Sequence, residues 1–159
     1  MTVVIGPRQV GKTYLMAELR KHLQEIGEKT VWLSLDNEED ERRLASQANL
    51  ISYIELQVGK DKAVVFIDEI QRKENAGLFL KGIFDMGTPY KFIVSGSGSL
   101  EIKANISESM AGRKQLFTVD TVSFEEFVNF KTNYQYEGRL ADFFELEEGK
   151  VAGWSSEYM

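Results

Sequence analysis

The residues best suited to carry chemistry form an octapeptide near the start of the chain. Its sequence, Gly6-Pro7-Arg8-Gln9-Val10-Gly11-Lys12-Thr13, matches the pattern G-x-x-x-x-G-K-[ST] in full. The glycines let the backbone curl until several N–H groups face one anion, and the lysine adds a full positive charge. The threonine hydroxyl is a suitable oxygen ligand for Mg²⁺. This loop, together with the following Tyr14, predicts a site for the phosphates of a nucleotide.

The sequence on either side has the form that such a loop needs. The β-branched run Thr2-Val3-Val4-Ile5 predicts a strand, and apolar residues between Lys12 and Ile26 recur at the three- and four-residue spacing of a helix. A helix that starts in the loop directs the positive end of its dipole at the anion. Chance would produce the octapeptide in about one of a few hundred chains of this length, and this context makes chance a poorer explanation.

A second motif, which is acidic, supports the phosphate loop. The apolar run that ends in Phe66-Ile67-Asp68-Glu69 predicts a strand with two carboxylates at its carboxyl end. Ligands of open α/β sheets bind along that edge. We expect Asp68 to bind Mg²⁺, directly or through water, and Glu69 to orient and deprotonate an attacking water. An isolated Asp-Glu pair is more typical of a helix N-terminus, so this interpretation depends on the nearby phosphate loop.

The remaining elements predict an α/β fold. Further strands are expected at Thr30–Leu35, Ala63–Ile67, Lys91–Val94 and Gln115–Val119, and helices at Glu38–Ala48, at 50–58 and around Leu78–Phe84. Strands that are apolar throughout and alternate with helices indicate a parallel sheet covered on both faces. The acidic run Glu38–Glu41 is interpreted as a solvated first helical turn rather than a metal site, since two arginines follow it.

The composition excludes several classes of function. The chain of 159 residues has a net charge of −6, which argues against nucleic acid or an anionic membrane as the default partner. It contains no cysteine and one histidine, His22, so thiolate chemistry and histidine-rich metal clusters are excluded. The apolar runs are too short to cross a bilayer, and we expect a soluble cytoplasmic protein.

Five blocks in order carry a resemblance to a known family. They are the phosphate loop, Phe-Ile-Asp-Glu-Ile-Gln (66–71), Val-Ser-Gly-Ser-Gly-Ser-Leu (94–100), Ser-Glu-Ser-Met-Ala-Gly-Arg (107–113) and Val-Ser-Phe-Glu-Glu-Phe (122–127). Together they resemble the prokaryotic AAA+ ATPases that carry a DUF4143 C-terminal domain. The resemblance implies a P-loop NTPase fold of the ASCE/AAA+ type, a three-layer sandwich whose five-stranded parallel sheet has the order 5-1-4-3-2. It also implies ATP and Mg²⁺ as cofactors.

The resemblance also implies roles for two further residues. Ser95 is the best match to the polar sensor 1 residue at the end of the fourth strand, and Ser97 is the second choice; a flexible Ser/Gly turn is an equal explanation. Arg113 matches the arginine finger, through which a neighbouring subunit supplies charge to the transferring phosphate. An ordinary arginine at a helix C-terminus is the alternative. Arg8 either touches nucleotide or is simply an exposed loop residue.

These observations predict an ATPase core within a longer protein. We expect residues 1–130 to form the core and residues 131–159 to form either an acidic connector or the start of a missing C-terminal region, since residues 137–159 hold six acidic and two basic residues. Hydrolysis of ATP would drive a conformational or assembly switch. We expect a homo-oligomer formed through Arg113, and an unknown protein partner bound by the missing C-terminal region. The alternative is a nucleotide-binding switch with negligible turnover. A small-molecule kinase is a weaker third hypothesis.

Overall fold

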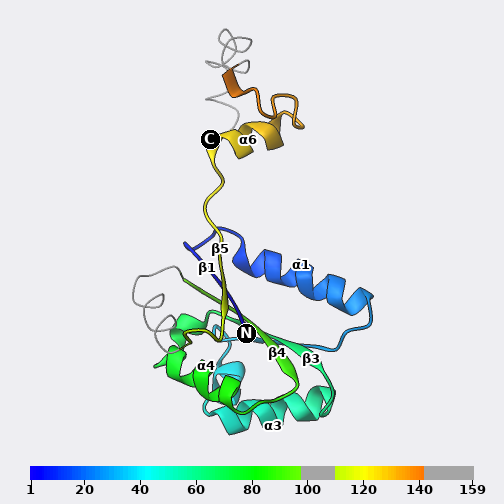
Figure 1. The fold of residues 1–159 in the computed structure, drawn as a ribbon, viewed down its shortest axis with the longest axis vertical. Helices are drawn as coiled ribbons and strands as arrows, with labels where there is room; N and C mark the ends of the chain where they lie inside the picture. The colour runs from blue at the N-terminus through cyan, green and yellow to red at the C-terminus, as the bar shows by residue number, and fades with distance from the viewer. Residues whose placement is uncertain (98–109, 142–159) are drawn as a thin grey trace. The chain divides into compact units, whose positions relative to one another are not determined.

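The computed structural model describes residues 1–97 and 110–141 (Figure 1). The elements follow one another as β1 (Thr2–Gly6), α1 (Lys12–Glu25), β2 (Thr30–Ser34), α2 (Glu38–Arg43), α3 (Gln47–Val58), β3 (Ala63–Asp68), the 3₁₀ helix η1 (Ile70–Arg72), α4 (Ala76–Asp85), β4 (Tyr90–Ser97), β5 (Gln115–Thr118) and α6 (Phe124–Lys131).

The five strands form one parallel sheet in the order β2-β3-β4-β1-β5. This is the predicted order 5-1-4-3-2 named from the other edge, so the predicted fold class is confirmed. Thr2 of β1 pairs with Ile93 on one side and with Gln115 on the other. Because all the strands run the same way, the loops after β1, β3 and β4 emerge at one edge of the sheet.

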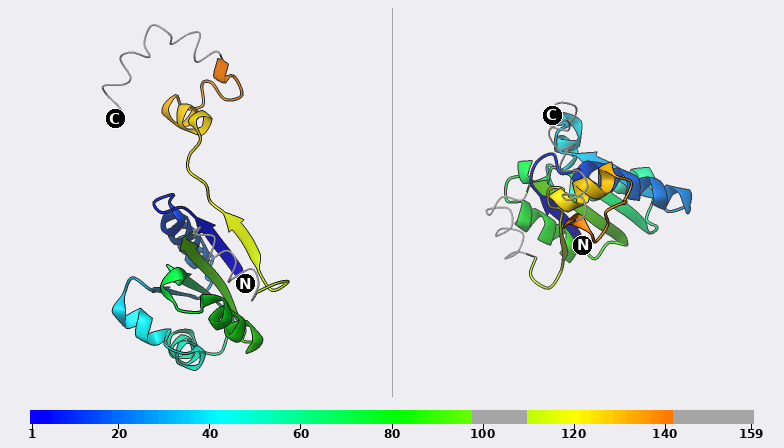
Figure 2. Two further views of the ribbon diagram at one scale, coloured as in Figure 1. Left: turned by 90° about the vertical axis from the view of Figure 1, so that its left-hand side faces the viewer. Right: turned by 90° about the horizontal axis from the view of Figure 1, so that it is seen from above.

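Helices cover both faces of the sheet, with α1 on one face and α3 and α4 on the other (Figures 1 and 2). Successive side chains of β3 explain this arrangement, because they point to opposite faces. Val65 and Ile67 pack in the larger core with residues of α3 and α4, whereas Val64 and Phe66 pack with Met16 of α1. Every residue of β3 is buried, which is why the strand is apolar throughout rather than alternating.

The sequence placed one helix boundary wrongly. The helix expected to reach Ala48 ends at Arg43, and α3 begins at Gln47, after the N-cap Ser46. The Ser46 hydroxyl accepts a hydrogen bond from the Asn49 N–H at 3.1 Å and caps the new helix. The acidic first turn of α2 is not wholly solvated either, because Asp40 is buried and accepts a hydrogen bond from the Ser34 N–H at 2.9 Å.

The chain divides into two compact units, Met1–Asp120 and the residues from Thr121 onward. The first contains the whole sheet. The second contains α6, which begins with a capping box between Ser123 and Glu126. In the part of the chain that the structure describes, no helix is both long enough and apolar enough to span a membrane.

Candidate functional site

The predicted phosphate loop connects β1 to α1. Its first glycine lies against the backbone that follows β5: a Cβ atom on Gly6 would stand 2.1 Å from the carbonyl oxygen of Val119. At its other end, Gly11 has the left-handed φ of 90° that glycine adopts most easily. Two separate constraints, a close approach and a backbone twist, therefore select glycine at the two positions that the motif fixes.

The loop ends in an uncapped helix N-terminus beside a buried cation. Gly11, the N-cap of α1, offers no side chain to the first N–H groups of the helix, which leaves them as donors for an anion. Lys12 is 5% exposed, and its ammonium donates to the carbonyl oxygens of Gly6 at 3.0 Å and Pro7 at 2.7 Å. The lysine charge is thus held within the curl of the loop itself.

The structure brings the strand-end acid of the second motif to the phosphate loop. The Thr13 hydroxyl donates to Oδ2 of Asp68 at 2.8 Å, across 55 residues of sequence. On its other side, Oδ1 of Asp68 accepts a hydrogen bond from the Ser95 hydroxyl. Asp68 is 3% exposed and Ser95 is fully buried. The three side chains therefore join α1, β3 and β4 at the carboxyl edge of the sheet.

The residue after Asp68, Glu69, has a strained backbone conformation. Its φ of 59° and ψ of 40° lie in the left-handed region, which a residue with a Cβ occupies at a cost. The Glu69 N–H donates to Oδ1 of Asp68 at 3.1 Å and to the Ser95 hydroxyl at 3.3 Å. The Glu69 carboxylate in turn accepts a hydrogen bond from the side-chain amide of Gln71.

An open cavity of about 530 Å³ lies over these residues. It is lined by Arg8, Gln9, Gly11, Lys12, Thr13, Tyr14, Asp36, Glu69 and Arg72. Sequence reasoning missed Asp36 and Arg72, which form an ion pair of 2.6 Å at this cavity. The rule that ligands bind at the carboxyl edge could have indicated Asp36, since it follows β2. Ser97 contributes differently from Ser95, with its backbone N–H bonded to Gln71 rather than its hydroxyl to Asp68.

The donor atoms fit Mg²⁺ bound together with a nucleotide. Mg²⁺ prefers oxygen ligands, keeps several waters, and is commonly held by one or two protein oxygens plus phosphates. The Thr13 hydroxyl and the Asp68 carboxylate supply two adjacent oxygens of this kind. Within residues 1–97 and 110–141, no group of three or more His, Cys, Asp or Glu could hold a metal ion by itself.

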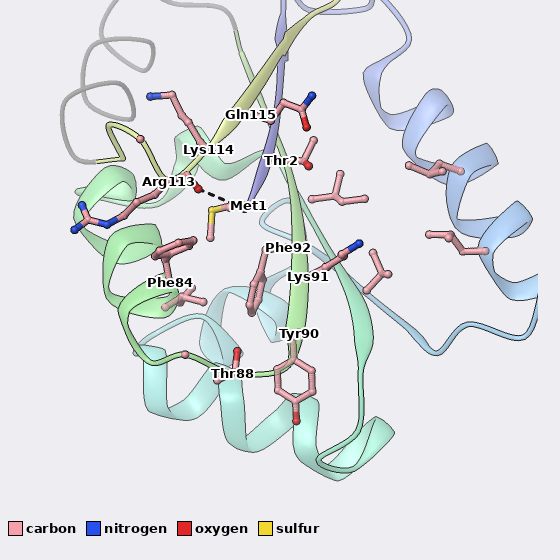
Figure 3. Close-up of a pocket in the computed structure, with 17 residues that line it drawn as sticks. Met1, Thr2, Phe84, Thr88, Tyr90, Lys91, Phe92, Arg113, Lys114 and Gln115 are labelled. Carbon is pink, nitrogen blue, oxygen red and sulfur yellow. Dashed lines mark hydrogen bonds between the residues drawn. The ribbon is translucent and has the colours of Figure 1, made fainter.

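Arg113 lies near the amino-terminal ends of the strands, whereas the phosphate loop lies at their carboxyl ends. It precedes β5, whose first residue pairs with Thr2 at the start of β1, whereas the loop follows the end of β1. A five-residue strand separates these levels by about 15 Å. The Arg113 guanidinium pairs with Asp85 at 3.6 Å, and its carbonyl oxygen accepts a hydrogen bond from the N-terminal amine (Figure 3). Arg113 therefore does not reach the phosphate loop of its own chain.

Arg113 is one of the residues that line a second cavity, of about 900 Å³ (Figure 3). Met1, Phe84, Tyr90 and Phe92 also line it. Burial raises the pKa of the Tyr90 phenol, which donates to the Gly59 carbonyl at 2.7 Å. This cavity contains neither the glycine loop nor Thr13 nor Glu69, which line the smaller cavity.

A parallel sheet in this order, with a glycine-rich loop leading into a helix and an Asp-Glu pair on the strand two places away, defines an AAA-type P-loop protein. Comparison with protein families agrees. The AAA_14 family, described as an AAA domain, matches residues 1–128, and the chain belongs to this family.

Individual relatives are more distant. The chain is 25% identical over 158 residues to an uncharacterized protein of Methanocaldococcus jannaschii, MJ1544, with 99% of this chain and 34% of that protein covered. It therefore spans about a third of that relative's length. Among solved structures, the ORC1 protein of Aeropyrum pernix in complex with DNA is similar, with a TM-score of 0.50 and 13% identity over 73% of this chain and 38% of ORC1. At this identity the likeness shows the fold alone.

Proposed function

We propose that this chain binds ATP with Mg²⁺ and hydrolyses it. The observation that carries the proposal is the 2.8 Å hydrogen bond between Thr13 and Asp68, which joins the two sequence motifs in one site. Lys12 and Glu69 line the same cavity as Thr13. Membership of an AAA family supports nucleotide binding as the activity of this cavity.

Each residue of the site has a distinct task in this proposal. The N–H groups at the start of α1 and the Lys12 ammonium bind phosphate oxygens and stabilise the charge that develops on them. Thr13 and Asp68 would hold Mg²⁺, which supplies further positive charge at the phosphates when bound. Glu69 orients a water molecule and accepts its proton at the carboxylate. The fully buried Ser95 hydroxyl fixes the Asp68 carboxylate, to which it donates, and the Glu69 backbone N–H, from which it accepts.

Two substitutions with matched controls test the proposal. Lys12→Ala should abolish ATP binding, measured by calorimetric titration, whereas Lys21→Ala on the exposed side of α1 should bind normally. Glu69→Gln should bind ATP normally and lose turnover, whereas the exposed Glu74→Gln should keep both. Normal hydrolysis by Glu69→Gln would remove Glu69 from the mechanism. An absence of ATP-dependent heat or stabilisation in the unaltered protein would overturn the proposal as a whole.

A second candidate function is a nucleotide switch that turns over negligibly as a single chain. The position of Arg113 favours it, because this arginine precedes β5 at the level where β1 starts, about 15 Å along the strand direction from the level of the loop that follows β1, and would complete the site only of a second copy. In that case turnover per chain rises with protein concentration. Mixing Arg113→Ala with Lys12→Ala should restore activity that neither has alone, because each lacks a different half of a shared site.

The ion pair of Arg113 needs its own control. Asp85→Asn breaks the same 3.6 Å contact while keeping the arginine, so it should leave concentration-dependent turnover intact. Loss of turnover in Asp85→Asn equal to that in Arg113→Ala would mean that the ion pair matters only for the fold. Turnover that is independent of concentration would remove the trans role and the homo-oligomer with it.

We further propose that this core works within a longer protein. Residues 1–130 would form the ATPase core, and residues 131–159 a connector to a C-terminal region of the DUF4143 type that binds a protein partner. The support is that the chain spans about a third of its relative from Methanocaldococcus jannaschii. The net charge of −6 gives no support to carrying over the DNA in the ORC1 structure as a partner.

A further inference from the structure

The side chain of Gln71 connects the Glu69 carboxylate to the end of β4. Its amide nitrogen donates to Oε2 of Glu69, and its amide oxygen accepts a hydrogen bond from the backbone N–H of Ser97 at 2.9 Å. Glu69 follows β3 and Ser97 ends β4. One glutamine thus spans from the acid that faces the phosphate cavity to the neighbouring strand.

The chemistry of the partners fixes which way the amide points. A backbone N–H can only donate, so it requires the amide oxygen, and an ionised carboxylate can only accept, so it requires the amide NH₂. Glutamine satisfies both partners at once, whereas glutamate at this position would turn an acceptor toward Glu69. The two contacts therefore select an amide rather than any polar side chain of this length.

The position of Ser97 in the sheet shows which part of the site Gln71 connects to Glu69. Ser97 is the register partner of Gly6, the first residue of the phosphate loop. Gln71 therefore relates the Glu69 carboxylate to the strand pair from which the loop starts. The backbone on either side of Gln71 is also held in place, because Ile70 is fully buried and the Arg72 N–H donates to the Glu69 carbonyl at 3.0 Å.

Glu69 needs such a restraint. Its left-handed backbone projects the side chain from a turn rather than from a strand, and a glutamate side chain has several rotatable bonds. While Oε2 is bonded to Gln71, Oε1 receives no hydrogen bond from any residue that the structure describes, and Glu69 still lines the phosphate cavity. One oxygen is held and the other is left for a water molecule.

We propose that Gln71 is a positioning residue for hydrolysis: it holds the Glu69 carboxylate at a fixed place relative to the phosphate loop. The inference rests on the proposed function, since it assigns Gln71 a part in the reaction for which Glu69 is the base. Misplacement of a reacting group by about 1 Å costs on the order of a hundredfold in rate. Loss of Gln71 should therefore reduce turnover without reducing the affinity for ATP.

Two variants of matched length test the inference. Gln71→Met removes both hydrogen bonds, and Gln71→Glu keeps an acceptor for Ser97 but replaces the donor that faces Glu69. Both should lower kcat on the order of tenfold to a hundredfold, with the Kd for ATP and the melting temperature close to those of the unaltered protein. Gln57→Met, at an exposed glutamine of α3, is the control and should change none of the three.

The outcomes separate this inference from the proposed function. Normal kcat in both variants would overturn the role of Gln71 while leaving ATP hydrolysis in place. Normal kcat in Gln71→Glu alone would also overturn it, because the contact with Ser97 would then suffice. If Gln71→Met fails to fold, Gln71→Glu carries the test. No turnover by the unaltered protein at any concentration would overturn the proposed function, and this inference with it.

Discussion

Replacing Gly6 by alanine tests whether the phosphate loop is built by close contact with the end of β5. The added Cβ would lie 2.1 Å from the Val119 carbonyl oxygen and 3.2 Å from Cγ2 of Val10. Non-bonded heavy atoms pack at about 3.5 Å, so the backbone at Val119 or the loop itself must move by about 1.4 Å. A backbone carbonyl cannot turn aside as the end of a flexible side chain can.

The expected cost follows from these contacts. Overpacking a well-packed site costs about 1–3 kcal/mol. Moving Val119 also strains the 2.7 Å hydrogen bond from its N–H to the Ile5 carbonyl, which contributes about 1 kcal/mol. We therefore expect Gly6→Ala to lower the free energy of unfolding by about 2–4 kcal/mol, or the melting temperature by roughly 5–15 °C. ATP affinity should fall with it, because the same loop holds Lys12.

Urea unfolding followed by fluorescence would measure this loss. Trp32 is a natural probe, since it stacks on Phe66 in the same unit as Gly6. Gly82→Ala in α4 is the matched control: the three atoms nearest to its Cβ all belong to the side chain of Gln47, which can move, and alanine favours a helix by up to about 1 kcal/mol. A Gly6→Ala protein as stable as the unaltered one would refute the argument from close contact.

Three further predictions concern the metal and its ligands. Thr13→Val keeps the side-chain shape but removes the hydroxyl, so ATP should bind with little dependence on Mg²⁺; titrations with and without Mg²⁺ would decide, and an unchanged dependence would exclude Thr13 as a ligand. Ser95→Ala deprives the buried Asp68 of a donor and should cost about 1–3 kcal/mol in urea unfolding; a loss below 0.5 kcal/mol would count against that contact. Chelation with EDTA should stop ATP turnover, and excess Mg²⁺ should restore it; turnover that persists in EDTA would contradict the metal site.

Much of the fold could be predicted because its signals are local. The β-branched and apolar runs mark the five strands, and the spacing of apolar residues marks α1. The break between the two helices was predicted at the wrong place, after Ala48 rather than after Arg43, because the apolar pattern does not show that the Ser46 side chain caps a new helix at Gln47. The burial of Asp40 was not predicted either, because its hydrogen-bond donor is the Ser34 N–H at the end of β2, which the pattern of residues in the helix cannot indicate.

The local sequence is enough to identify the chemical groups of the site and to place them at the ends of strands. The octapeptide fixes a loop, a lysine and a hydroxyl in one short segment, and the Asp68-Glu69 pair follows its own strand, so both motifs are legible without any distant contact. How the two motifs meet depends on contacts between strands. The strand order sets β4 between β1 and β3, so a β4 residue, Ser95, reaches Asp68. The same order lets Gln71 tie Glu69 to Ser97 at the level of Gly6, because parallel pairing fixes the register of strands far apart in sequence.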